Sequence, residues 1–257
     1  MRKLAILLLL IFATATLRAG VVEKADSAYA EKNYVEAIRL YGLAADSLGT
    51  SSDLYYNIGN AYYRLQKPGK AILNYERSLR LDPSNADARA NLDFINSKLP
   101  DRPGQRGTFV GNAFDAAADF LGTNGWATAA LVCFVLVVGA GLLYFFASNI
   151  ALRKLGFFGG GCLLLVTVIS LFFSFRGASS QDSDDEAIIT ESSTILSTSP
   201  RQPANASEEA MLLHEGTKLT ILDSVTVTTD SVKTTWLDVE VDNEHRAWVN
   251  ARAVERI

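Results

Sequence analysis

The chain has 257 residues, a formal net charge of −4 and 49% hydrophobic residues. Its 24 Lys and Arg residues form no cluster or stripe, which excludes the basic surface that nucleic-acid binding requires. The composition indicates a modular protein with modest soluble parts rather than one large globule.

Residues 1–19 have the pattern of a secretory signal peptide. Arg2 and Lys3 precede the apolar stretch 4–13, and small residues offer cleavage sites at Ala15 and Ala19. The apolar stretch is too short for a comfortable membrane span. If it stayed as an anchor, its basic end would remain inside, so both interpretations place the following domain outside the cytoplasm.

Residues 20–99 contain a repeat with a period of 34 residues. A shift of 34 places Ala37 on Ala71 and Tyr41 on Tyr75, and this is the period of helix–turn–helix repeats. The second unit resembles the tetratricopeptide repeat. The resemblance rests on five residues. Gly59 lets the two helices approach, Tyr62 and Tyr75 fill the space between them, and Ala71 avoids a clash. Pro83 ends the second helix. The first unit matches less well, because Ala25 and Gly49 stand at the glycine and proline positions.

A fifth helix is expected from Ala86 to Leu99, capped by Asn85. It is either half of a third repeat or a terminal cap. Four polar residues on its remaining faces favour the cap: Asp87, Arg89, Asn91 and Asp93. Two repeats and a cap are near the minimum for a stable stack, so we expect the stack to lean on a partner or on a second copy.

The resemblance implies that the inner face of each first helix forms a ligand groove. Carried over by position, six residues of the second repeat would bind a partner protein there: Asp53, Tyr56, Asn57, Asn60, Tyr63 and Arg64. Asparagine amides can hold a peptide backbone, tyrosines can bury apolar groups, and an arginine can pair with a carboxylate. Asp26, Tyr29 and Lys98 are weaker candidates. The alternative is that any such repeat would carry these residues.

Residues 100–125 are expected to form a linker and a juxtamembrane helix. Prolines and glycines break the chain between residues 100 and 107. Val110, Phe114 and Leu121 then recur at helical spacing. This segment is either a helix on the outer leaflet or a plain connector.

Two uncharged apolar runs, 126–147 and 155–175, predict a transmembrane hairpin. At about 1.5 Å per residue, each run spans roughly the 30 Å hydrocarbon core of a bilayer. The link 148–154 carries Arg153 and Lys154, which favours a cytoplasmic link with both flanking regions outside. Because neither run contains a charge, an ion path or transporter site is unsupported.

Small residues near the link predict close packing of the two spans. The candidates are Gly139 and Gly141 in the first span and Gly156 and Gly160 in the second. The spacing of the second pair could instead serve association with another membrane protein.

Residues 176–209 are rich in Ser, Thr and Asp, which indicates a solvated acidic tether.

In residues 210–257, the alternating segments 218–223 and 236–241 predict half-buried strands. The opening Leu213-His214-Glu215-Gly216, a Trp-x-x-Val strand and an Ala-Trp-Val strand resemble a bacterial SH3-like domain, although Ala247 replaces its usual glycine. Trp236 and Trp248 are candidates for a ligand surface, or alternatively core residues or hairpin clamps.

No catalytic, metal or cofactor motif is recognisable. The two histidines, His214 and His245, both lie in the β segment, and we expect each at a surface turn rather than as a ligand. Neither an HExxH helix, a Ser-His-Asp arrangement, a Walker loop nor a dinucleotide fingerprint can be assembled. We therefore expect a protein that is not an enzyme and needs no cofactor.

The order of modules resembles the E-type members of the Bacteroides aerotolerance (Bat) group. The expected fold is a multidomain membrane protein with all-α tetratricopeptide repeats, a two-helix transmembrane hairpin and a small all-β SH3-like barrel. The resemblance implies a bacterial inner-membrane scaffold, with repeats and barrel on the periplasmic side. Its implied partners are Bat proteins with von Willebrand A-type domains and an AAA-type ATPase, in oxygen tolerance and stress. The alternative is a cell-wall sensor whose SH3-like domain recognises peptidoglycan peptides.

Overall fold

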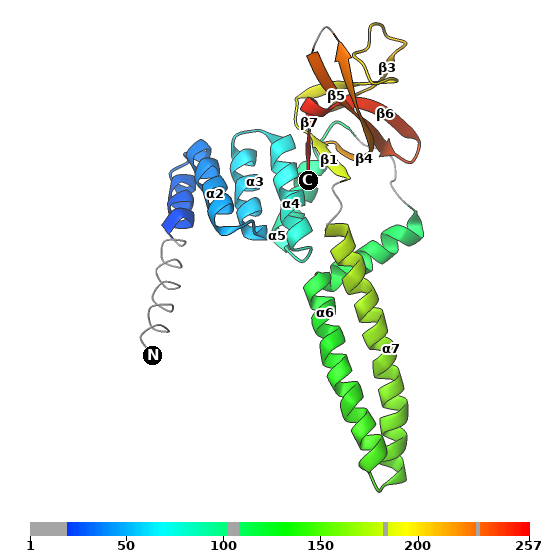
Figure 1. The fold of residues 1–257 in the computed structure, drawn as a ribbon. Helices are drawn as coiled ribbons and strands as arrows, with labels where there is room; N and C mark the ends of the chain where they lie inside the picture. Colours follow the sequence, from blue (N-terminus) through cyan, green and yellow to red (C-terminus); the bar gives the residue numbers. More distant parts are fainter. Residues whose placement is uncertain (1–19, 102–107, 182–184, 230–231) are drawn as a thin grey trace. The chain divides into compact units, whose positions relative to one another are not determined.

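The computed structural model describes residues 20–101, 108–181, 185–229 and 232–257. The chain divides into two compact units, one with the helical repeats and a β-sheet, the other with two long helices (Figure 1). The expected signal peptide lies outside the described residues, as do parts of the expected linker and tether.

Five helices make up the repeat region. The first spans residues 20–30, and α2 (Tyr34–Leu48), α3 (Ser52–Arg64), α4 (Pro68–Leu81) and α5 (Ala86–Asn96) follow. The side chains of Asn33, Ser51 and Asn85 each accept a hydrogen bond from the backbone N–H three residues later, which starts α2, α3 and α5. Helix α4 starts with Pro68, where a missing N–H costs no helical hydrogen bond.

The 34-residue period reappears in the hydrogen bonds. The hydroxyl of Tyr41 donates to Asp26 at 2.5 Å, and the hydroxyl of Tyr75, 34 residues later, donates to Asn60 at 2.6 Å. Both tyrosines are buried. In each unit a tyrosine of the second helix is therefore fixed to a polar side chain of the first helix.

Gly59 permits the close contact between α3 and α4. A methyl group at this position would lie 2.8 Å from two ring carbons of Tyr75, well inside van der Waals contact. In contrast, a methyl group at Gly42 in α2 would have no neighbouring atom within 4 Å. The two glycines thus occupy opposite packing environments within one repeat stack.

The second unit contains α6 (Phe109–Phe146) and α7 (Ile150–Gln181), both long and apolar enough to cross a membrane. Helix α6 joins the expected juxtamembrane helix to the first span, with a break at Gly122, where φ is 66° and ψ is 169°. Helix α7 begins at Ile150, so the link is shorter than 148–154, and Arg153 and Lys154 lie at the start of α7. The reason is local, because Asn149 accepts a hydrogen bond from the N–H of Ala151.

Two of the four candidate glycines lie where α6 meets α7. A methyl group at Gly156 would lie 2.6 Å from the carbonyl oxygen of Ala140, and one at Gly160 would lie 3.2 Å from its methyl carbon. Added methyl groups at Gly139 and Gly141 would meet no described atom within 4 Å. The expected close contact with α7 is therefore made by Gly156 and Gly160 through Ala140 and is absent at Gly139 and Gly141, although Gly141 lines a cavity together with Gly156 and Gly160.

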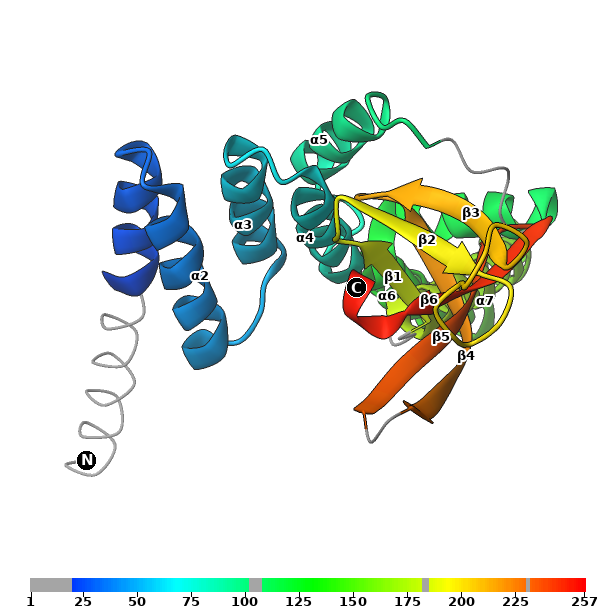
Figure 2. The same cartoon turned by 90° about the horizontal axis from the view of Figure 1, so that it is seen from above.

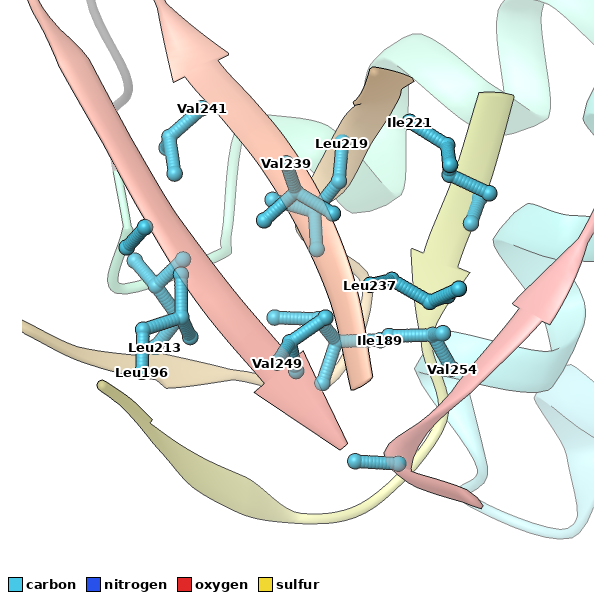
Figure 3. Packing of buried hydrophobic residues seen from close by; sticks show 13 residues of the cluster. Ile189, Leu196, Leu213, Leu219, Ile221, Leu237, Val239, Val241, Val249 and Val254 are labelled. Atoms are coloured by element: carbon cyan, nitrogen blue, oxygen red, sulfur yellow. The ribbon is translucent and has the colours of Figure 1, made fainter. Parts of the chain in front are cut away.

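Within the described residues, seven strands form one antiparallel sheet in the order β3-β2-β6-β5-β4-β1-β7. Their bounds are β1 (Glu186–Ile189), β2 (Ser193–Ser197), β3 (Glu209–His214), β4 (Lys218–Thr229), β5 (Val232–Asp242), β6 (His245–Asn250) and β7 (Val254–Arg256). Leu213 and Val254, from the two outermost strands, belong to the same buried cluster, so the sheet curls around a single core (Figure 3).

Strands β1 and β2 lie within the expected tether, which corrects that prediction. Ala187 and Ile189 are buried in the core of the sheet, and Leu196 of β2 is buried with them. The average composition of residues 176–209 is polar, so the prediction missed these short apolar runs. Helix α7 also continues past residue 175, the expected end of the second span.

Strand β1 attaches the sheet to the repeats. Ile188, between the two residues that face the sheet core, is buried among residues of α4 and α5, and β1 lies beside α4 in both views (Figures 1 and 2). Lys218 reaches Glu76 at 3.2 Å and Glu186 at 2.8 Å, and Glu186 also meets Arg80 at 3.1 Å. Burial alone would lower the pKa of Lys218, but the two carboxylates outweigh it and raise that pKa.

Asp101 makes a second attachment between the repeats and the sheet. Its carboxylate accepts hydrogen bonds from the backbone N–H of His214 at 2.5 Å and from the hydroxyl of Thr217 at 2.7 Å. The ring Nδ1 of His214 lies 2.8 Å from the other carboxylate oxygen. Burial alone would raise the pKa of Asp101, but these contacts outweigh it and hold the pKa below its usual value.

Gly59→Ala should destabilise the repeats by about 1–3 kcal/mol, because the new methyl group must push the ring of Tyr75 out of place. Urea unfolding of the full chain in detergent, followed by circular dichroism, measures the change. Gly42→Ala is the matched control and should be neutral or mildly stabilising. Equal effects of the two substitutions would contradict the packing role of Gly59.

Asp101→Asn should lower the melting temperature of the sheet at pH 7, measured by tryptophan fluorescence, because the amide loses charge-assisted bonds. The folded pKa of Asp101 is depressed, so its stabilisation is fully present above the unfolded pKa of about 3.9 and is lost as pH falls through the folded pKa. The difference from the native chain should therefore shrink below about pH 4. Asp93→Asn, at an exposed position of α5, is the control. A difference that grows on acidification would contradict the assignment.

Candidate functional site

A cavity of about 130 Å³ opens on the repeats between the first helices of the two units and α5. Helix α3 supplies three of its lining residues, Asn60, Tyr63 and Arg64. The others come from the helix 20–30, from α4 and from α5: Tyr29, Tyr75, Asn91, Phe94 and Ile95. We call this cavity the repeat groove.

A hydrogen-bonded group of three side chains lies in the wall of the repeat groove. Asn60 accepts from the hydroxyl of Tyr75 at 2.6 Å and from the amide of Asn91 at 3.0 Å. Burial raises the pKa of Tyr75, so its hydroxyl stays protonated and remains a donor at neutral pH. The carbonyl oxygen of the Asn60 side chain is therefore used by the protein itself.

Aromatic faces and one cation remain for a ligand. The rings of Tyr63 and Phe94 meet edge to face with their centroids 6.3 Å apart, and both side chains are exposed. The guanidinium of Arg64 is close to Tyr29, with Nε 3.4 Å from the hydroxyl. Within the described part of the chain, Arg64 has no carboxylate within ion-pair distance. The groove is suited to an apolar or aromatic side chain next to a negative charge.

The structure brings together only half of the six predicted partner-binding residues. Asn60, Tyr63 and Arg64 line the groove, but Asp53, Tyr56 and Asn57 do not. Tyr56 instead packs on Tyr75, with ring centroids 6.0 Å apart. The prediction included every residue on the inner face of α3. The cavity, however, forms only near the C-terminal end of α3, where α5 lies close.

Sequence reasoning missed the contribution of α5 to the groove. Asn91 was expected on the outer polar face of a cap, but it is half-buried and donates to Asn60. A signal existed, because a further shift of 34 residues places Asn57 on Asn91 and Asn60 on Phe94. Helix α5 therefore lines the groove as the first helix of a third repeat would. Of the weaker candidates, Tyr29 lines the groove and Asp26 accepts from Tyr41.

The two candidate tryptophans of the sheet do not form a joint surface. Trp236 has only 4% of its surface exposed, and Trp248 is half-buried. Trp236 therefore belongs to the packed part of the sheet, which agrees with the core alternative and not with a ligand surface at this position. Along β5, residues 236–239 are all buried, so both faces of this strand are covered.

Both histidines are paired with a carboxylate. His214 contacts Asp101, and the ring Nδ1 of His245 lies 2.7 Å from Asp242. Among the described residues, no three His, Cys, Asp or Glu side chains are arranged to hold a metal ion.

Residues 52–85 match the model of the tetratricopeptide repeat, which confirms the predicted second unit. The matched segment comprises α3, α4 and the cap of α5. A search of curated proteins found no match for the chain. The repeat indicates a role in protein–protein interaction.

Proposed function

We propose that this protein is a non-catalytic, membrane-anchored adaptor that binds an extended segment of a partner protein in the repeat groove. The observation that carries the proposal is a groove on a tetratricopeptide repeat with exposed aromatic rings and one cation, Arg64, that has no carboxylate partner among the described residues. The three-residue hydrogen-bond group behind these rings fixes the wall before any ligand arrives. A preformed wall reduces the conformational entropy that binding must offset.

The anchor in this proposal is the helix pair α6 and α7. Both helices could span a bilayer, and Arg153 and Lys154 are the fourth and fifth residues of α7, close to the short turn between the helices. These charges favour a cytoplasmic turn. The repeats and the sheet would then both lie on the periplasmic side of a bacterial inner membrane.

We also propose a more specific assignment, to the Bat group of proteins. The order of repeats, helix pair and small sheet supports a Bat-type adaptor, with the curled sheet as the bacterial SH3-like domain and von Willebrand A-type Bat proteins as partners. The alternative is a cell-wall sensor whose SH3-like domain recognises peptidoglycan peptides, and the burial of Trp236 removes one of the two tryptophans that could contact such a ligand. We therefore favour protein partners over the cell wall.

A photo-crosslinking amino acid in place of Tyr63 should capture a discrete protein partner in living cells, because this exposed ring lies in the groove. The same probe at Leu43, which is exposed on α2 outside the groove, is the control. Mass spectrometry identifies the product. Equal products from both positions, or none from Tyr63, would count against the groove as the docking site.

Single cysteines should report the proposed orientation. In a Cys133→Ala, Cys162→Ala background, cysteines replacing Ser47 in the repeats and Ser224 in the sheet should react with a membrane-impermeant maleimide in intact spheroplasts. A cysteine replacing Ala151 should react only after permeabilisation, because it lies beside the basic turn. Any other labelling pattern would refute the proposed topology.

A further inference from the structure

A second and larger cavity, of about 690 Å³, continues from the repeat groove. Tyr63, Arg64 and Ile95 line both cavities. On its far side the second cavity is lined by turn residues of the sheet, Ser192 and Glu215. We call it the junction cavity, because neither the repeats nor the sheet would form it alone.

The walls of the junction cavity are held together by buried contacts. A methyl group at Gly69, near the start of α4, would lie 2.9 Å from Glu215 and equally close to the carbonyl oxygen of Ile189. Gly216 has a φ of +92°, a conformation that favours glycine, and it lies against Ile72 and Leu99. The β3–β4 turn is thus packed on the repeats and forms one wall of the cavity.

The acidic side chains near the cavity are already in use. Glu215 accepts a hydrogen bond from the N–H of Gly69 at 3.1 Å, which places a carboxylate at the positive end of α4. Asp101 is bonded to His214 and Thr217. These carboxylates therefore serve the fold rather than a ligand.

The two cations that line the cavity, Arg64 and Lys98, contact aromatic residues instead of carboxylates. Lys98 lies over the ring of Phe94, with its Nζ 3.8 Å from the centroid, and Arg64 approaches Tyr29. Within the described residues neither cation has a carboxylate at ion-pair distance. Apolar groups surround them: Tyr63, Pro68, Ile95, Leu99 and Pro100. An anionic group next to an apolar one complements this lining.

We propose that the junction cavity binds an aspartate or glutamate side chain, with an adjoining apolar residue, of the partner segment that lies in the repeat groove. The inference rests on the proposed function, because one continuous segment occupies both cavities. An internal side chain fits better than a chain terminus. Terminal carboxylates are typically held by free backbone N–H groups, and Gly69 at the start of α4 already donates to Glu215.

Three matched arrays of immobilised random decapeptides test this proposal with the full chain in detergent. The first carries amidated peptides with one Glu next to Leu or Phe, the second replaces Glu by Gln, and the third has no internal acid but a free C-terminus. We expect the first array to bind at least about tenfold more tightly than the second, since a desolvated charge pair is lost. Tighter binding to the third array would overturn the assignment to a side-chain carboxylate.

Two variants locate the bound carboxylate. Lys98→Gln should weaken binding to the Glu array about five- to tenfold and leave the Gln array unchanged, with Lys24→Gln at an exposed position of the first helix as control. Ser192→Trp should block the cavity from the sheet side, with Ser224→Trp on exposed β4 as control. If both variants behave like their controls, the junction cavity is not part of the site.

Tyr29→Ala separates this inference from the proposed function, because Tyr29 lines only the repeat groove. If it weakens binding while the Lys98 and Ser192 variants do not, the groove remains the binding site and the junction inference falls. If no array binds the native chain, both proposals fall. Circular dichroism of each variant verifies that the repeats and sheet are folded.

Discussion

Ile188 is a residue of the β-sheet that lies in the core of the helical repeats. Strand β1 has two buried faces, with Ala187 and Ile189 toward the sheet and Ile188 toward α4 and α5. Because side chains alternate along a strand, three consecutive small or branched apolar residues serve two cores at once. The repeats and the sheet consequently act as one compact unit, and the junction cavity between them depends on this attachment.

The charges around β1 add specificity to that attachment. Lys218, Glu76, Glu186 and Arg80 are partly buried, so the desolvation of each offsets much of its Coulomb attraction. Such a network contributes little net stability compared with Ile188. However, it disfavours other alignments of the sheet on α4, because a shifted alignment would leave a partly buried charge without its partner.

The repeat groove is built from residues with separate tasks. Asn60 and Tyr75 satisfy each other and Asn91, which keeps the helices at a fixed distance. Tyr63 and Phe94 remain exposed in front of them. Asparagine and tyrosine can therefore either bind a ligand or hold the helices together. Only the hydrogen bonds in the structure show which of the two roles a given residue has. This is why only half of the six residues transferred position by position from the repeat family line the groove.

Local patterns in the sequence determined the helical repeats, the two apolar helices and strands β4, β5 and β6 of the C-terminal sheet. The 34-residue period, the caps at Ser51 and Asn85, and the proline that starts α4 all act within a few residues or along one helix face. The close contact at Gly59 was also readable, because the repeat places a tyrosine opposite it. These features need no knowledge of distant parts of the chain.

Only the tertiary structure decided the role of β1, the burial of Trp236 and the place of Asn91. The residues around β1 are polar on average, and its apolar triplet becomes a strand because two separate cores supply partners for it. Gly139 and Gly141 illustrate the same limit, since the rotation of α6 against α7 selects which small residues touch. Burial and contact depend on which distant segments pack against a residue. A local sequence pattern does not contain this information.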